Sequence, residues 1–128
     1  MSLPAFLPVA IGGAGGALAR WWTTRALTGV GGWDAAWSTA LVNVAGAFAL
    51  GLAASLLAER VADGQQSALA LLLMVGFLGA FTTFSTFAMD AVWLLRERGL
   101  GLAALYVGGS VGLALLAFLG GALIGARA

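Results

Sequence analysis

The sequence predicts an all-α membrane protein with four transmembrane helices, and three observations support this fold class. Of its 128 residues, 62% are hydrophobic and only 9% are charged, whereas a soluble domain carries about 25% charged residues. Four windows contain no Asp, Glu, Lys or Arg, and each can hold the ~20 apolar residues that a helix needs to cross the hydrocarbon. Short polar connectors separate these windows. We therefore expect a single integral-membrane domain over residues 1–128, with both termini on one side.

The boundaries of the four spans follow from these windows. The charge-free windows cover residues 1–19, 35–58, 64–89 and 99–126. The predicted spans are roughly 3–22, 36–58, 67–94 and 100–125. The connectors are Arg25 to Asp34, Glu59 to Gln66, and Arg96 to Gly99. The first window is no ordinary signal peptide, because no Lys or Arg precedes its apolar stretch.

Composition and charge exclude several other classes of protein. The chain has no Cys and no His, so disulfides and thiolate metal sites are excluded. A net charge of +1 provides no electrostatic surface for nucleic acid. No nucleophile–base pair or phosphate-binding loop is present, which argues against an enzyme.

Loop arginines leave the membrane orientation open. Arg25, Arg96 and Arg98 lie in connectors on one side, against Arg60 and Arg127 on the other. The positive-inside rule normally rests on a clearer difference. Either the chain inserts one way on a small margin, or it inserts both ways and can form an antiparallel dimer.

Glycines and one arginine form a stripe in the first span. Gly12, Gly16 and Arg20 are spaced four residues apart. A dinucleotide fingerprint is excluded, because its third glycine would fall at Leu18 and no βαβ unit surrounds it. Small residues at this spacing let two helices approach closely. Arg20 is either an interfacial anchor or a fixed positive charge at the mouth of an anion pathway.

Two other spans each contain a polar pair. Thr39 and Asn43 are four residues apart in the second span, and Tyr106 and Ser110 are four apart in the last. Asn43 could hydrogen-bond a neighbouring helix or coordinate an anion through its amide N–H groups. Polar residues aligned in this way predict a helix bundle with a narrow polar lining.

The third window mixes aromatic rings with hydroxyl groups. At about 100° per residue, one stripe contains Phe77, Phe81, Phe84 and Phe87. The interleaved hydroxyl residues are Thr82, Thr83, Ser85 and Thr86. Because these hydroxyls compete for backbone hydrogen bonds and Gly76 and Gly79 precede them, we expect a helix break near mid-membrane within residues 78–83. Broken transmembrane helices expose backbone groups that bind ions.

Together these motifs resemble the CrcB/Fluc family of fluoride channels. The matching stretches are GGAGGALAR (12–20), TALVNVAGAF (39–48) and GFLGAFTTFSTF (76–87), with Tyr106 and Ser110 in the last span. The resemblance covers the whole chain. Asp90 departs from it, because Glu is commoner at this position.

The resemblance implies a passive, fluoride-selective channel that exports cytoplasmic fluoride across the inner (plasma) membrane of a bacterium. It also implies an antiparallel, dual-topology homodimer. The implied fluoride pathway contains Asn43, Phe84, Phe87, Ser85, Thr86, Tyr106, Ser110, Arg20 and Thr39. A structural sodium ion at the dimer centre would be held by the backbone carbonyls of Gly79 and Thr82 from both subunits.

A small, dual-topology, proton-coupled drug or cation exporter is the alternative. Such a transporter has a similar size and span count, but it needs a carboxylate embedded in the membrane. The first span has none, and Asp90 at the end of the third window is the one acidic candidate near a helix.

Overall fold

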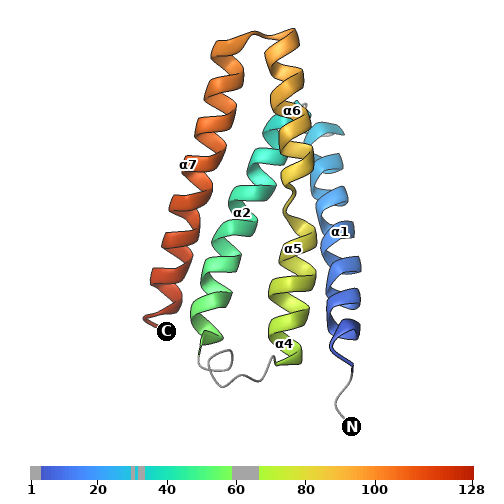
Figure 1. Cartoon of the computed structure of the whole chain (residues 1–128), viewed down its shortest axis with the longest axis vertical. Helices are drawn as coiled ribbons and strands as arrows, with labels where there is room; N and C mark the ends of the chain where they lie inside the picture. Colours follow the sequence, from blue (N-terminus) through green and yellow to red (C-terminus); the bar gives the residue numbers. More distant parts are fainter. Residues whose placement is uncertain (1–3, 30, 32–33, 59–66) are drawn as a thin grey trace.

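The computed structural model describes residues 4–29, 31, 34–58 and 67–128, and every regular element in these ranges is helical. The four long helices are α1 (Phe6–Gly29), α2 (Ala35–Leu56), α6 (Phe84–Glu97) and α7 (Leu100–Gly125). Three short elements precede α6, namely α4 (Ala68–Ala70), the π-helix η1 (Leu71–Leu78) and α5 (Gly79–Phe81). The elements form one bundle in which the start of α1 and the end of α7 lie at the same end (Figure 1).

Within the described residues, three helical runs are long and apolar enough to cross a membrane. They are α2, the run Ala68–Glu97 and α7. Helix α1 is also long, at 24 residues, but it contains two arginines. The helix continues to Gly29, past the predicted end of the span at 22, so Arg25 lies on α1 and not in a connector. The predicted connector at 59–66 lies outside the described residues.

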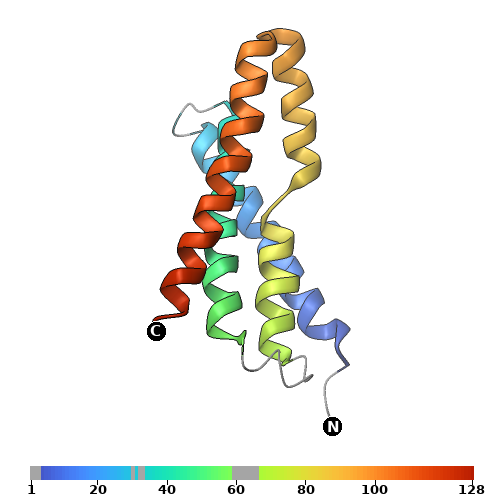
Figure 2. The same cartoon turned by 60° about the vertical axis from the view of Figure 1, so that its left-hand side comes forward.

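The third helical run is interrupted between α5 and α6 (Figure 2). Thr82 (φ −78°, ψ 157°) and Thr83 (φ −148°, ψ 118°) are both extended. These two residues lie within the range 78–83 where the sequence places a break. Thr83 is the N-cap of α6, and its side chain accepts a hydrogen bond from the Thr86 N–H at 3.2 Å, as Thr often does at this position. The π-helical geometry of η1 was not predicted from the sequence.

Helix α1 packs backbone to backbone against η1. A Cβ atom added to Gly12 would overlap the carbonyl oxygen of Leu72, and one added to Gly16 would overlap that of Phe77. On the facing element, a Cβ at Gly76 would lie 2.8 Å from the Val9 carbonyl oxygen. The glycine stripe of the first span therefore serves the close helix approach that its spacing predicts.

Helices α2 and α7 make the second close contact. Cβ atoms at Gly51 and Gly121 would overlap carbonyl oxygens of the opposite helix. Nearby, Ser55 Oγ donates to the carbonyl oxygen of Ala122 at 2.9 Å. At the other end of α7, a buried cluster joins α2, α6 and α7 through Ala36, Phe87, Leu94, Ala103 and Tyr106.

The α6–α7 hairpin turns at Gly99, whose φ of 91° favours glycine. The neighbouring Arg98 lies 3.9 Å from the carboxylate of Asp34. Both side chains are about half exposed, so this ion pair contributes little to stability.

Candidate functional site

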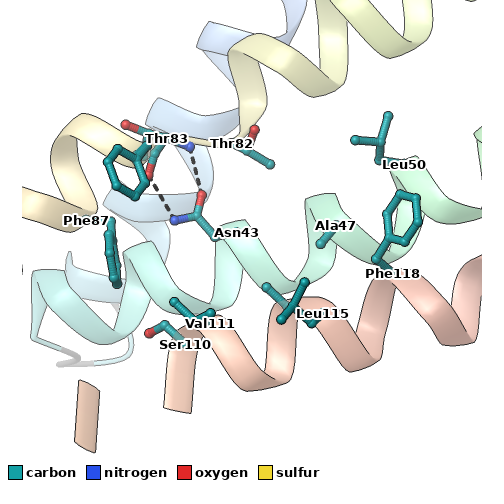
Figure 3. A pocket seen from close by; sticks show the side chains of 12 residues that line it. Asn43, Ala47, Leu50, Thr82, Thr83, Phe87, Ser110, Val111, Leu115 and Phe118 are labelled. Atoms are coloured by element: carbon teal, nitrogen blue, oxygen red, sulfur yellow. Dashed lines mark hydrogen bonds between the residues drawn. The ribbon is translucent and has the colours of Figure 1, made fainter. Parts of the chain in front are cut away.

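The Asn43 side chain binds the backbone of Thr83 at the interruption of the third helical run. Its Nδ2 donates to the carbonyl oxygen of Thr83 at 2.9 Å, and its Oδ1 accepts from the Thr83 N–H at 2.7 Å (Figure 3). The amide side chain thus replaces both backbone partners that Thr83 would have in a regular element. Of the two interpretations of Asn43, the interhelical hydrogen bond is therefore present. The second N–H of the amide is still available for another acceptor.

The hydroxyl residues of the third helical run form hydrogen bonds with nearby residues of the same run. Thr82 Oγ1 donates to the Leu78 carbonyl oxygen at 3.0 Å. Thr83 Oγ1 lies 3.0 Å from Thr86 Oγ1 and 3.4 Å from Ser85 Oγ. Among these hydroxyls, that of Thr83 replaces a lost backbone partner, because its Oγ1 accepts from the Thr86 N–H.

The four phenylalanines do not form one stripe, because the extended residues change the helical phase. Phe77 and Phe81 stack on each other before the interruption, with ring centroids 6.1 Å apart. Phe84 and Phe87 form a separate pair at 5.6 Å after it. In this second pair, Phe84 is 79% exposed and Phe87 is 8% exposed.

Tyr106 connects the second phenylalanine pair to a buried carboxylate. Its side chain is 0% exposed, and its ring stacks on Phe87 with centroids 5.4 Å apart. Its hydroxyl donates to Asp90 Oδ2 at 3.5 Å, a long hydrogen bond. One turn further along α7, Ser110 Oγ is buried without a hydrogen-bond partner in the part of the chain that the structure describes.

A cavity of about 390 Å³ brings several predicted pathway residues together (Figure 3). Four predicted pathway residues line it, namely Asn43, Phe84, Phe87 and Ser110. The remaining lining residues are Ala47, Leu50, Thr82, Thr83, Val111, Ala114, Leu115 and Phe118.

A second cavity, of about 460 Å³, lies beside α1. It is more polar, and the predicted residues Arg20, Thr39 and Thr86 line it. Thr83 lines this cavity as well as the first, so the residue that Asn43 binds borders both spaces. Thr39 points its hydroxyl at the Ala35 carbonyl oxygen of its own helix, at 3.1 Å.

Besides Thr83, four residues of this second cavity with a hydroxyl group or a charge were not assigned to the pathway from the sequence. They are Thr24, Arg25, Thr28 and Asp90. Thr24 and Thr28 continue the four-residue spacing of Gly12, Gly16 and Arg20, and this spacing could have identified them. The sequence prediction ended the span at 22, so the stripe was not followed further.

Two predicted pathway residues lie outside both cavities. Ser85 is exposed on α6, and Tyr106 lies in the buried cluster between the helices. Of the predicted sodium ligands, Gly79 is exposed and Thr82 is half-buried beside the interruption.

Comparison with known proteins identifies the family. The family described as "CrcB-like protein, Camphor Resistance (CrcB)" matches residues 7–122. The chain belongs to this family. All of the sequence stretches that carry the resemblance lie inside the matched range.

Similar proteins cover nearly the whole chain. A relative from Synechocystis is 40% identical over 126 residues, which is 98% of this chain and 95% of the relative. One from Rhizobium etli is 42% identical over 120 residues, or 93% of each chain. One from Methylococcus capsulatus is 43% identical over 119 residues, and this chain spans only 51% of its length. All three are called "Fluoride-specific ion channel FluC".

Proposed function

We propose that this chain forms a passive, fluoride-selective channel. The observation that carries the proposal is the shared name of relatives that are 40–42% identical over 93% or more of both chains. The same names favour a channel over the proton-coupled exporter, and over an enzyme. Within the chain, Asn43, Phe84, Phe87 and Ser110 around one cavity suit this function.

The chemistry of these residues fits a small, strongly hydrated anion. A selective pore must replace the water around fluoride with hydrogen-bond donors, yet bind it weakly enough to release it. Neutral donors of this kind are the second N–H of Asn43 and the hydroxyl of Ser110, which has no partner among the described residues. Phe84 and Phe87 add the electropositive edges of their rings.

The polar cavity beside α1 is the entrance in this proposal. Arg20 and Arg25 both line it, and their positive charges attract anions. Thr86 lines the entrance and is hydrogen-bonded to Thr83, which lines both spaces. Fluoride passes from the entrance, along these hydroxyls, to the space bounded by the phenylalanine pair.

The active unit in this proposal is an antiparallel, dual-topology homodimer in which α1 is the fourth membrane span of each chain. Phe84 is 79% exposed in a single chain, although Phe rings in a pathway need walls on every side. A second copy would supply them. The three-against-two distribution of loop arginines permits both orientations. A C-terminal Cys tag reached by impermeant label from only one face of the membrane would contradict dual topology.

Sodium at the dimer centre is part of the same proposal, and the hydrogen bonds at the interruption support it. In a continuous α-helix, the Thr83 N–H would bond to the Gly79 carbonyl and the Thr86 N–H to the Thr82 carbonyl. Here these N–H groups donate to Asn43 Oδ1 and Thr83 Oγ1 instead. Both carbonyls have therefore lost their helical donors, and such groups are costly in hydrocarbon unless satisfied. Carbonyls of Gly79 and Thr82 from two copies would satisfy a monovalent cation.

The setting we propose is the inner (plasma) membrane of a bacterium. Hydrogen fluoride is a neutral weak acid that crosses membranes and dissociates inside the cell. A passive pore then lets the fluoride anion leave down its electrical gradient.

Efflux from liposomes tests the proposed function. Purified protein is reconstituted in vesicles loaded with fluoride or with chloride, and anion release is followed after a potassium ionophore removes the electrical barrier. We expect rapid fluoride release and little chloride release. Equal release of both anions, or a proton-dependent cation flux without fluoride flux, would contradict the proposal.

A further inference from the structure

Four aromatic rings contact one another in series, from Trp37 on α2 to the exposed Phe84 on α6. Trp37 meets Tyr106 edge to face, with centroids 5.8 Å apart and an interplanar angle of 81°. Tyr106 stacks on Phe87 at 5.4 Å and 30°. Phe87 contacts Phe84 at 5.6 Å and 37°. Three helices thus contribute to one series of ring contacts.

The middle of this series is confined on every side. Tyr106 is 0% exposed and Phe87 is 8% exposed, so neither ring can reorient without moving a neighbour. The Tyr106 hydroxyl is restrained by Asp90, and its ring is restrained by contacts with Phe87 and with Trp37. Of these three restraints, Trp37 is the only one from α2.

Trp37 also lines a mostly apolar groove between α2 and α7, which shares Ser110 with the first cavity. Leu41, Leu105 and Leu113 line this groove with it, and neither arginine of the anion entrance does. The indole is partly buried and lines neither the cavity around Asn43 and Phe87 nor the cavity beside α1. The ring contact with Tyr106 links the indole to the phenylalanine pair.

We propose that Trp37 is a positioning residue that sets the tilt of the Phe87 ring through Tyr106, and thereby sets the discrimination between fluoride and larger anions. The inference rests on the proposed channel function. The edge of an aromatic ring is electropositive and its face is electronegative, so a change in tilt replaces attraction of an anion by repulsion. An edge-to-face contact restrains rotation of Tyr106 in a way that an aliphatic side chain does not.

The test compares three variants in the liposome assay. Trp37→Leu removes the ring, Trp37→Phe keeps a ring, and Trp22→Leu is the matched control because Trp22 is 71% exposed on α1. An aromatic pair is worth roughly a three- to tenfold change in an equilibrium. We expect Trp37→Leu to lower fluoride flux by about that factor and to lower the fluoride-to-chloride ratio as well. Trp37→Phe and Trp22→Leu should stay within about twofold of the wild type on the same scale.

A double variant separates positioning from simple packing. If Trp37 acts through Tyr106, adding Trp37→Leu to Tyr106→Leu should cause little further loss of selectivity, because coupled residues are not additive. If Trp37→Leu does not yield a folded protein, Trp37→Met takes its place, since Met fills volume without a ring. A normal fluoride-to-chloride ratio in the folded Trp37 variant, or full additivity with Tyr106→Leu, overturns the inference. A wild-type protein that releases no fluoride overturns the channel function itself, which is a distinct outcome.

Discussion

The two halves of the interrupted third helical run pack by opposite means. Before the interruption, η1 contacts α1 through backbone atoms, with Gly12, Gly16 and Gly76 leaving no room for a single Cβ atom. After it, α6 contacts α2 and α7 through side chains, and Phe87 and Asp90 are buried against Tyr106. Only two extended residues separate these halves.

This difference indicates how one segment can serve both anchorage and ion chemistry. Backbone-to-backbone packing in a membrane excludes lipid and fixes position, but it offers no side chain to a ligand. Side-chain packing offers rings and hydroxyls, and it depends on their orientation. Asn43 joins the halves, because it holds the extended Thr83 on which α6 begins. Substitutions in the two halves should therefore fail in different ways.

The largest effect is expected in the first half, from Gly16→Val. The added side chain would overlap the Phe77 carbonyl oxygen, and overpacking of this kind costs about 1–3 kcal/mol or more. Backbone cannot swing aside as a flexible side chain can, so we expect loss of folded protein on size-exclusion chromatography in detergent. Gly13→Val is the matched control, because a Cβ there meets no atom of the described residues within 4 Å. Equal yields of the two variants would show that the close contact is dispensable.

The next largest effect on stability and flux is expected from Asn43, which binds Thr83 between the two halves. Asn43→Leu removes both partners of the Thr83 backbone, and each unsatisfied buried group costs about 1–3 kcal/mol. We expect a lower thermal midpoint and a fluoride flux reduced by at least about tenfold, since one such group already corresponds to that factor. Asn43→Asp keeps the acceptor but replaces the donor to the Thr83 carbonyl, so it should lose flux while losing less stability. Leu56→Ala, an exposed change on the same helix, is the control for general destabilisation of α2.

Much of this organisation could be predicted from local sequence, because local spacing and chemistry cause it. The four-residue spacing of Gly12 and Gly16 predicts a close contact, and it is present. Glycines followed by hydroxyls predict a break, and Thr82 and Thr83 are extended. The π-helix η1 could not be predicted, because no residue type specifies it and it lies against α1 in the folded bundle.

The sequence predictions that were wrong also relied on local spacing alone. Helical periodicity places four phenylalanines on one stripe only if the helix is continuous, and the extended residues divide them into two pairs. Ending the first span at 22 treated Arg25 as part of a loop, although α1 continues to Gly29 and Arg25 lines the polar cavity beside α1. Partners of a side chain, such as Asn43 with Thr83, lie 40 residues apart in sequence and become visible only in the fold.

Within the second half, the two phenylalanines should respond differently to the same change. Phe87→Ile removes a buried ring that contacts Tyr106 and Phe84, so we expect lower fluoride flux and a stability loss of about 1 kcal/mol. Phe84→Ile alters a ring that is 79% exposed in one chain, so it should reduce flux with little change in the thermal midpoint of the monomer fold. Normal flux in both variants would mean that these rings only pack.

The smallest effect should come from Arg20 and Arg25, which lie on α1, outside the third helical run, and act on the ion through their charge. Arg20 is partly buried and Arg25 is exposed, with the Arg25 guanidinium 5.7 Å from the centroid of the Trp21 ring. Charges that only raise the local anion concentration are screened by salt, with a Debye length of about 10 Å at 0.1 M. Arg25→Gln should therefore lower fluoride flux by roughly two- to threefold at low ionic strength and have little effect at high ionic strength. Arg20→Gln should reduce flux more, and its effect should persist at high salt, because a partly buried charge is screened less. Flux through both variants is measured in liposomes over a series of potassium gluconate concentrations. An Arg25→Gln defect that does not change with salt would assign Arg25 a direct contact with the ion instead of an electrostatic role at the entrance.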